Sequence, residues 1–154
     1  MLKYKLIRRL TNINNLVQET ANLVHLEARD QNVHIEIITD DAIPTFNFYY
    51  NQIKQVLLNL VINALDAVKS GGHIKIQTRA SNGTILLAVE DNGQGISMED
   101  RRNIFNPFFT TKTRGTGLGL AISKKIAKEH GGDLQIESAP SKGSRFTLSL
   151  PIKT

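Results

Sequence analysis

The stretch that decides the fold is residues 52–70, QIKQVLLNLVINALDAVKS. Most of it is apolar, but four polar side chains recur through it at spacings of four, four and three residues: Gln55, Asn59, Asn63 and Asp66. On a helix, these spacings put all four side chains on one face. Polar groups among apolar neighbours need hydrogen-bond partners. The stripe is therefore either a set of core amides that cap neighbouring backbone, or the wall of a polar cleft whose amide oxygens can receive a cation or ligand.

Composition indicates one soluble domain. Its 154 residues are enough for one proper core, with 40% hydrophobic and 21% charged residues. No apolar run approaches the ~20 residues of a membrane span, and the N-terminus lacks a signal-peptide pattern. The absence of cysteine excludes disulfides and thiolate metal sites, and it fits a reducing cytoplasm. We expect a cytoplasmic domain, with any membrane anchor of the full protein in segments absent from this chain.

The net charge of +5 is unevenly placed. The excess lies in residues 101–128, which carry seven basic side chains and no carboxylate. A local basic patch indicates an anionic partner. A nucleotide phosphate tail and a nucleic acid are both candidates, and a solvated basic face is the structural alternative.

Hydrophobic period and turn residues predict the order of elements. Near-helical spacing predicts helix over residues 2–31, with Thr11 or Asn12 as the N-cap of a new helix inside that span and residues 1–10 as the end of a longer element. The remaining expected elements are strands at 33–39 and 46–48, the helix at 52–70, a hairpin of 73–79 and 84–90, a short helix near 98–104, a helix from about 117 to 129, and a hairpin of 134–138 and 145–150. This order predicts an α/β two-layer sandwich, with helices on one face of a mixed, mainly antiparallel sheet.

A carboxylate followed by two glycines ends the second of these hairpin strands, in Asp91-Asn-Gly-Gln-Gly95. As a plain turn this sequence is common. It is not a calcium loop, because the twelfth position, where such loops need glutamate, is Arg102. As a binding loop, Asp91 would accept a hydrogen bond from an exocyclic amine, and the glycines would let a flat base approach the backbone.

A second glycine-rich stretch, Gly115-Thr-Gly-Leu-Gly119, opens a helix. It does not match the dinucleotide-binding glycine pattern, and the chain has no Walker A lysine motif. Backbone N–H groups at a helix start still attract anions, and Lys112 and Arg114 stand just before them. Upstream, the aromatic cluster Phe105-Asn-Pro-Phe108 predicts that the phenylalanines pin the base of a long loop, 106–117, which would act as a lid over a ligand.

These motifs occur together in the order of one known family. Listed along the chain, Asn59-Leu-Val-Ile-Asn63-Ala, Asp91-Asn-Gly-Gln-Gly95, Phe105-Asn-Pro-Phe108, Gly115-Thr-Gly-Leu-Gly119-Leu and Gly143-Ser-Arg-Phe146 closely resemble the N, G1, F, G2 and terminal glycine boxes of the catalytic domain of sensor histidine kinases. The resemblance covers about residues 12–151, and residues 107–132 look like the nitrogen-regulation and sporulation-kinase branch. It implies the Bergerat ATP-binding fold, which gyrase B and the mismatch-repair ATPases share.

The resemblance implies ATP and Mg²⁺ as ligands. Asn63 would ligate the Mg²⁺, and Asn59 would contact phosphate or a metal-bound water. Asp91 would accept a hydrogen bond from the adenine amino group, with Gly93 and Gly95 making room. The complete ATP-binding set that it implies is Asn59, Asn63, Asp91, Gly93, Gly95, Ile96, Phe105, Lys112, Arg114, Gly115, Thr116, Gly117, Leu118, Gly119 and Thr147.

Asp66 stands where many members carry a lysine or aromatic residue that touches the phosphates, so its role is open. Gln55 stands where the related hydrolytic ATPases place a glutamate base, so fast ATP hydrolysis is not expected. Thr147, on the last hairpin, would reach the adenine through water.

The phosphoacceptor motif of these kinases is missing from this chain. The motif has a helical histidine followed by an acid and then proline, and we interpret the four histidines that lack this context as surface or packing residues: His25, His34, His73 and His130. We therefore expect residues 1–11 to be the remnant of a dimerisation and phosphoacceptor domain, and residues 12–154 to be the catalytic ATP-binding domain. The implied enzyme is a histidine protein kinase that moves the γ-phosphate of ATP to a histidine on the absent domain by in-line transfer. The fragment alone should not phosphorylate itself.

The resemblance also implies partners. These are the chain's own dimerisation domain, a response regulator downstream, and a second copy in the full-length protein, while the fragment is expected to be a monomer that binds no nucleic acid. Two alternatives stay open. One is a nucleotide-binding switch of the anti-sigma serine-kinase type, and the other is a nucleic-acid-binding module that uses the basic patch, which a DNA-dependent but ATP-independent response would support.

Overall fold

The computed structural model describes residues 8–110 and 117–152. In chain order its elements are β1 (Arg8–Thr11), α1 (Ile13–Asp30), β2 (His34–Ile38), β3 (Phe46–Tyr49), α2 (Tyr50–Ala67), β4 (His73–Ser81), β5 (Thr84–Asp91), α3 (Met98–Arg101), α4 (Gly119–Glu129), β6 (Asp133–Ser138) and β7 (Ser144–Pro151).

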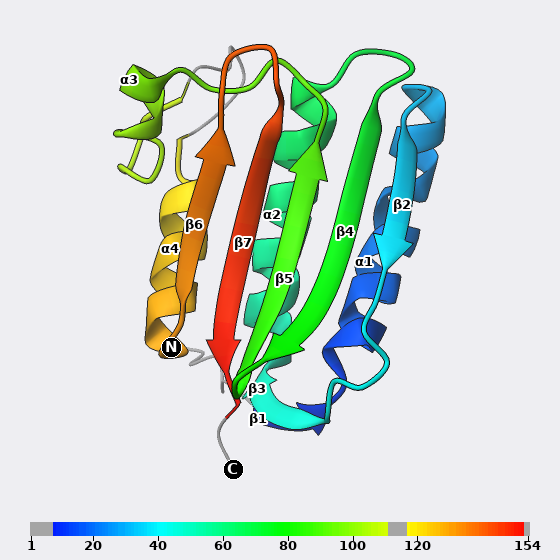
Figure 1. Ribbon diagram of the computed structural model, residues 1–154, viewed down its shortest axis with the longest axis vertical. Helices are drawn as coiled ribbons and strands as arrows, with labels where there is room; N and C mark the ends of the chain where they lie inside the picture. The colour runs from blue at the N-terminus through cyan, green and yellow to red at the C-terminus, as the bar shows by residue number, and fades with distance from the viewer. Residues whose placement is uncertain (1–7, 111–116, 153–154) are drawn as a thin grey trace, which may run out of the picture.

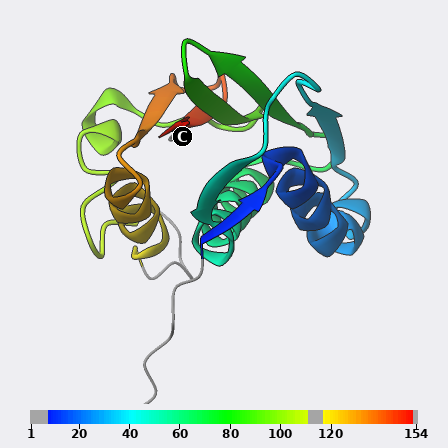
Figure 2. The ribbon, with the colours of Figure 1, turned by 90° about the horizontal axis from the view of Figure 1, so that it is seen from below.

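In the described part of the chain, one layer is a five-stranded sheet in the order β2-β4-β5-β7-β6 (Figure 1). β2 pairs parallel with β4, and the pairs β4–β5, β5–β7 and β6–β7 are antiparallel. Helices α1, α2 and α4 lie side by side on one face of this sheet (Figure 2). The predicted α/β two-layer sandwich with a mixed, mainly antiparallel sheet is confirmed.

Helix α2 lies behind the middle of the sheet and carries much of the core. Its side chains Ile53, Leu57 and Leu60 are fully buried, as are the inward-facing strand residues Ile76 and Leu87. Burying one such side chain contributes about 1.5–3 kcal/mol, so apolar packing fixes the position of α2 and with it the polar stripe. Among the described residues, no helix is long and apolar enough to cross a membrane.

The N-terminal segment departs from the expected helix. Residues 8–11 form β1, which pairs antiparallel with β3, so the helix predicted across them is wrong there. α1 begins at Ile13, because Asn12 has extended backbone and its side chain accepts a hydrogen bond from the amide of Asn14 at 2.8 Å. Asn12 was one of the two predicted caps. The assignment of residues 1–11 to a neighbouring domain stays a prediction.

The turn between β4 and β5 and the end of α2 both follow from local backbone conformation. Asn82 and Gly83 join β4 to β5 with φ angles of 51° and 74°, the left-handed pair that an Asn-Gly hairpin predicts. α2 ends at Ala67, short of the predicted end at residue 70, because Val68 already has extended backbone. The carbonyl of Ala67 accepts a hydrogen bond from the amide of Gln94 at 3.2 Å. The end of α2 is therefore tied to the loop that follows β5.

Candidate functional site

Asp91 ends β5 as a buried carboxylate on the face of the sheet that the helices cover, and only 6% of it is exposed. Its Oδ1 accepts a hydrogen bond from the amide of Gly93 at 2.9 Å, and it also accepts one from the backbone of Ser144. Burial raises the pKa of Asp91 above its ordinary value, while these two hydrogen bonds act in the opposite direction. A carboxylate held this way can receive one more donor without moving.

Gly93 and Gly95, expected to make room for a base, are explained by contacts with the protein itself. A Cβ on Gly93 would lie 2.3 Å from the carbonyl oxygen of Ala67, and one on Gly95 would lie 1.9 Å from that of Ala139. Both glycines let their loop pack against α2 and against the β6–β7 loop. The structure thus gives each glycine a packing reason, and the role of the two glycines in admitting a flat base stays a prediction.

The β5–α3 loop and the β6–β7 loop are joined by hydrogen bonds. The amide of Ile96 donates to the hydroxyl of Ser138 at 2.8 Å, and the amide of Ser141 donates to the carbonyl of Gln94 at 2.7 Å. The Arg101 guanidinium donates to the Ser138 carbonyl at 2.6 Å. Ile96, one of the predicted site residues, is half-buried and packs against the core. These hydrogen bonds hold the two loops together beside Asp91. We call this part of the structure, formed by Asp91, the β5–α3 loop and the β6–β7 loop, the Asp91 corner.

Ser144, which the sequence analysis did not single out, takes the place expected for Thr147. Side chains along β7 point alternately to the two faces of the sheet, so Ser144 is buried on the helix-covered face and Thr147 lies on the opposite face. Ser144 stands directly opposite Asp91 in the β5–β7 register, and its hydroxyl lies 2.8 Å from that of Ser138. The prediction that Thr147 reaches the same adenine as Asp91 is wrong. Counting the strand alternation back from buried Phe146 would have found Ser144.

The polar stripe of α2 divides into buried and exposed parts. Its ends, Gln55 and Asp66, are exposed, whereas Asn59 and Asn63 are half-buried. The amide nitrogen of Asn59 donates to the carbonyl of Gly119 at 3.4 Å and to the hydroxyl of Ser123 at 3.3 Å. Asn59 thus joins α2 to the start of α4, and we call this contact the α2–α4 junction. Because the amide nitrogen is used here, a ligand would contact the amide oxygen of Asn59.

The start of α4 has the character of an anion site. Leu118, which offers no side-chain acceptor, stands at the N-cap, and the first turn from Gly119 carries no acidic residue. The N–H groups and the dipole at such a start favour a negative charge. Gly117 and Leu118 lie with Gly119 at this helix start, and their contact with phosphates stays a prediction. The predicted residues Lys112, Arg114, Gly115 and Thr116 lie outside the described residues.

The two phenylalanines of the aromatic cluster behave differently. Phe105 packs edge-to-face on Phe146, with ring centroids 6.5 Å apart, so it anchors its segment to the core. The side chain of Phe108 is 75% exposed, so the expectation that it packs on the core is wrong. Its backbone does the anchoring instead: the Phe108 amide donates to the carbonyl of Gly117 at 2.9 Å.

Both the sequence and the fold of this chain are similar to those of known proteins. The family model described as histidine kinase-, DNA gyrase B-, and HSP90-like ATPase matches residues 49–154, more than half of the chain. This chain belongs to that ATPase family. Membership implies that the chain binds ATP, and it places the Asp91 corner and the α2–α4 junction in the fold of an ATP-binding domain.

Sensor histidine kinases are among the relatives of this chain. The chain is 43% identical over 141 residues to the signal transduction histidine-protein kinase AtoS of Escherichia coli K12, which covers 91% of this chain and 23% of AtoS. It is 34% identical over 142 residues to sporulation kinase E of Bacillus subtilis 168, over 92% of this chain and 19% of that kinase. The chain thus spans about a quarter or less of the length of these curated relatives.

Solved structures give the same result. The nucleotide-free catalytic domain of the histidine kinase ThkA matches with a TM-score of 0.87 and 36% identity, over 95% of this chain and 96% of that domain. A structure of ThkA with the response regulator TrrA matches at 0.82 and 33%, over 95% of this chain and 42% of that one. Full-length ShkA in complex with AMPPNP matches at 0.88 and 26%, over 97% of this chain and 32% of ShkA. The resemblance to histidine kinase catalytic domains is confirmed.

Proposed function

We propose that this chain binds Mg-ATP between the Asp91 corner and the α2–α4 junction, and that it delivers the γ-phosphate to a histidine on a dimerisation domain. The observation that carries the proposal is the pairing of two sites on one side of the sheet. One is a buried carboxylate at the end of β5, and the other is the start of α4, where Asn59 of α2 donates a hydrogen bond to the carbonyl of Gly119. The match to full-length ShkA, whose structure holds AMPPNP, supports the same nucleotide.

Each end of the site has a distinct role in this proposal. Asp91 accepts a hydrogen bond from the adenine amino group, and Ser144 lies next to it on the neighbouring strand. The N–H groups at the start of α4 contact the phosphates, and Asn59 fixes the distance between α4 and α2. The chain therefore acts by positioning the phosphates, with no side chain of the described residues needed as a proton acceptor.

The donor chemistry of α2 fits Mg²⁺. Asn63 offers a neutral amide oxygen, and Mg²⁺ binds through few protein ligands because it keeps several of its waters. Among the described residues, no group of three or more His, Cys, Asp or Glu could hold a metal by itself. The ion would reach the site with the nucleotide, and it would supply charge neutralisation across the phosphates.

The acceptor histidine is proposed to lie outside this chain. His130, for example, is committed to structure: its Nδ1 lies 2.9 Å from the carbonyl of Ile126, and its Nε2 accepts a hydrogen bond from the amide of Tyr49 at 3.3 Å. The proposed partners are the chain's own dimerisation domain and, by analogy with the ThkA–TrrA structure, a response regulator. The use of ATP leads us to expect that this domain works in the cytoplasm.

The test is isothermal titration with AMPPNP, with and without Mg²⁺, on the wild type and on Asn63→Ala. We expect Mg²⁺-dependent binding in the wild type and at least about a tenfold loss in Asn63→Ala, because a metal ligand is removed. Asn51→Ala is the matched control, since Asn51 is an exposed asparagine of the same helix. It should bind like the wild type, and both variants should melt within about 3 °C of it. No binding by the wild type, or a collapse of thermal stability in Asn63→Ala, would contradict the proposal.

A further inference from the structure

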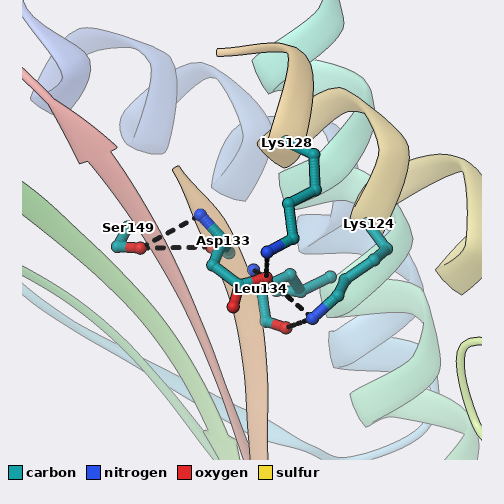
Figure 3. Close-up of polar contacts among 5 residues, drawn as sticks. All are labelled: Lys124, Lys128, Asp133, Leu134 and Ser149. Carbon is teal, nitrogen blue, oxygen red and sulfur yellow. Dashed lines mark hydrogen bonds and ion pairs between the residues drawn. The ribbon is translucent and has the colours of Figure 1, made fainter. Parts of the chain in front are cut away.

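Lys124, on α4, makes two strong polar contacts with the start of β6 (Figure 3). Its Nζ lies 2.7 Å from Oδ1 of Asp133 and donates to the carbonyl of Leu134 at 2.8 Å. Lys128, one turn later, reaches the same carboxylate at 3.3 Å. The pKa of Asp133 is lowered, chiefly by its hydrogen bond with Lys124. The two lysines thus share one anchor, but only Lys124 is shown to engage the backbone carbonyl as well.

Lys124 also touches the segment that precedes α4. Its Nζ lies 4.7 Å from the centroid of the Phe105 ring, within the range of a cation–π contact. The same ring packs edge-to-face on Phe146 of the sheet. One ammonium group therefore contacts α4's own neighbour strand β6 and the Phe105 anchor at once. Lys124 is a junction of three parts of the chain rather than a simple surface ion pair.

The Lys124 contacts and the Asn59 contact lie on different sides of α4, because consecutive residues of a helix project about 100° apart. Asn59 holds the first turn of α4 to α2 through Gly119 and Ser123, as described above. Lys124 is the residue after Ser123, and it holds the same stretch of α4 to β6 and to Phe105. The start of α4 is therefore fixed from two sides. Because a displacement of about 1 Å at a reacting centre can cost two orders of magnitude in rate, the second attachment bears on function.

We propose that Lys124 is a positioning residue of the nucleotide site, which holds Phe105 and the start of α4 in place on β6. The proposal rests on the proposed ATP-binding function, and it adds a residue that the resemblance did not assign. The Lys124–Asp133 pair keeps partial access to water, with 30% and 29% of the two side chains exposed. Ion pairs that water reaches contribute little to stability, so the loss of Lys124 should act on the site more than on the fold. Lys128 supplies a natural comparison, because it shares the Asp133 carboxylate without the other two contacts given for Lys124.

The experiment compares Lys124→Met with Lys128→Met in the whole chain. Each variant loses one ammonium near Asp133, and Lys124→Met also loses the contacts with Leu134 and Phe105. We expect Lys124→Met to bind Mg-AMPPNP about fivefold more weakly or worse. Lys128→Met should stay within about twofold of the wild type, as for a surface ion pair. Lys124→Arg should recover most of the affinity, because guanidinium can both pair with a carboxylate and stack on a ring.

Hydrogen exchange of the nucleotide-free protein gives a readout that does not depend on binding. Amides around Phe105 and Phe109 should exchange faster in Lys124→Met than in Lys128→Met, because the anchor has lost its contact. Equal affinity and equal exchange in the two variants would overturn the proposal. If the wild type bound no nucleotide, the proposed function would fail and the positioning role at a nucleotide site would fail with it, while exchange would still show whether Lys124 holds the Phe105 segment.

A second variant covers the case in which Lys124→Met does not fold. Phe105→Leu removes the aromatic ring below the ammonium but keeps an apolar side chain against Phe146. A loss of affinity together with faster exchange near residue 105 would support the proposal. Wild-type affinity and exchange in Phe105→Leu would overturn it.

Discussion

At Asp91, burial and hydrogen bonding act against each other. Burial disfavours the ionised carboxylate and raises its pKa, while the amides of Gly93 and Ser144 favour the ionised form. Because the pKa of Asp91 is raised on balance, the ionised carboxylate lowers the stability of the folded state when the pH is well above that pKa. A carboxylate kept at such a cost in a corner built from two loops is typical of a binding residue.

Asp91→Asn should separate binding from folding. A carboxyl group whose pKa is raised by folding adds to the free energy of unfolding when the pH is below its pKa in the unfolded chain. This contribution is lost as the pH rises through the pKa of the folded state. At pH 7 the native Asp91 therefore adds no stability through its raised pKa. We expect the variant to melt at or above the wild-type temperature at pH 7, and this difference should shrink as pH falls through the folded pKa. AMPPNP affinity should fall by about tenfold or more, because the charged acceptor for the adenine amine is gone.

Melting curves from pH 4 to 8 and a titration at pH 7 check both parts. Glu90→Gln is a suitable control, since Glu90 is the neighbouring carboxylate but is half-exposed and pairs with Lys75 at 3.4 Å. A melting temperature several degrees below the wild type in Asp91→Asn would mean that the carboxylate chiefly holds its loop together. Unchanged affinity would remove Asp91 from the proposed site.

At the scale of elements, the geometry of the Asp91 corner depends on how closely the loop after β5 approaches the loop before β7. A Cβ on Gly143 would lie 2.0 Å from the carbonyl oxygen of Asp91, and Gly143 has a φ of 78°. Gly83, in the β4–β5 turn, has a φ of 74° but nothing within 4 Å of its added Cβ. The two glycines share a backbone conformation and differ in the space around them.

Gly143→Ala and Gly83→Ala therefore form a matched pair. Gly83→Ala should lose only about 1 kcal/mol, the ordinary cost of a side chain in the left-handed region. Gly143→Ala should lose more, about 2–4 kcal/mol, because the Asp91 strand end must also shift, and its nucleotide affinity should fall with it. Urea unfolding and a titration of each variant measure these effects. Equal losses in the two variants would show that contact between the loops does not govern the corner.

The elements themselves were largely predictable, because most of them follow local patterns. Strand alternation and the Asn-Gly turn gave the β4–β5 hairpin, and the glycines after α4 gave its end. β1 could not be predicted from its own residues, because a strand of that length is decided by its partner β3, a tertiary contact. The exposed ring of Phe108 could not be predicted either. Its φ of 66° turns the chain at the base of the loop, and no sequence pattern marks that for a phenylalanine.

At the scale of the whole molecule, the order of the motifs predicted the family, and the fold then brought them together. What sequence order could not supply was the residue that each one faces on a neighbouring element. Thr147 and Ser144 both lie on β7, but only strand register places Ser144 opposite Asp91. Lys124 likewise stands in a run of basic residues, and its contacts with Asp133 and Phe105 depend on the packing of α4 against β6. Residues that act through tertiary contacts were the ones the sequence analysis missed.

As a unit with ATP, the chain is expected to transfer phosphate only to another domain. None of its histidines has the phosphoacceptor context, so the chain alone, incubated with γ-labelled Mg-ATP, should acquire no acid-labile label. Addition of a separately purified dimerisation domain of the proposed kind should give label on that domain. Asn63→Ala should abolish the transfer and Asn51→Ala should not, because only the first removes a proposed contact with the metal.

Label on the chain itself, mapped to His25 for instance, would contradict the assignment of the acceptor to another domain. Binding of nucleotide without transfer to any dimerisation domain offered would instead favour the switch-module alternative.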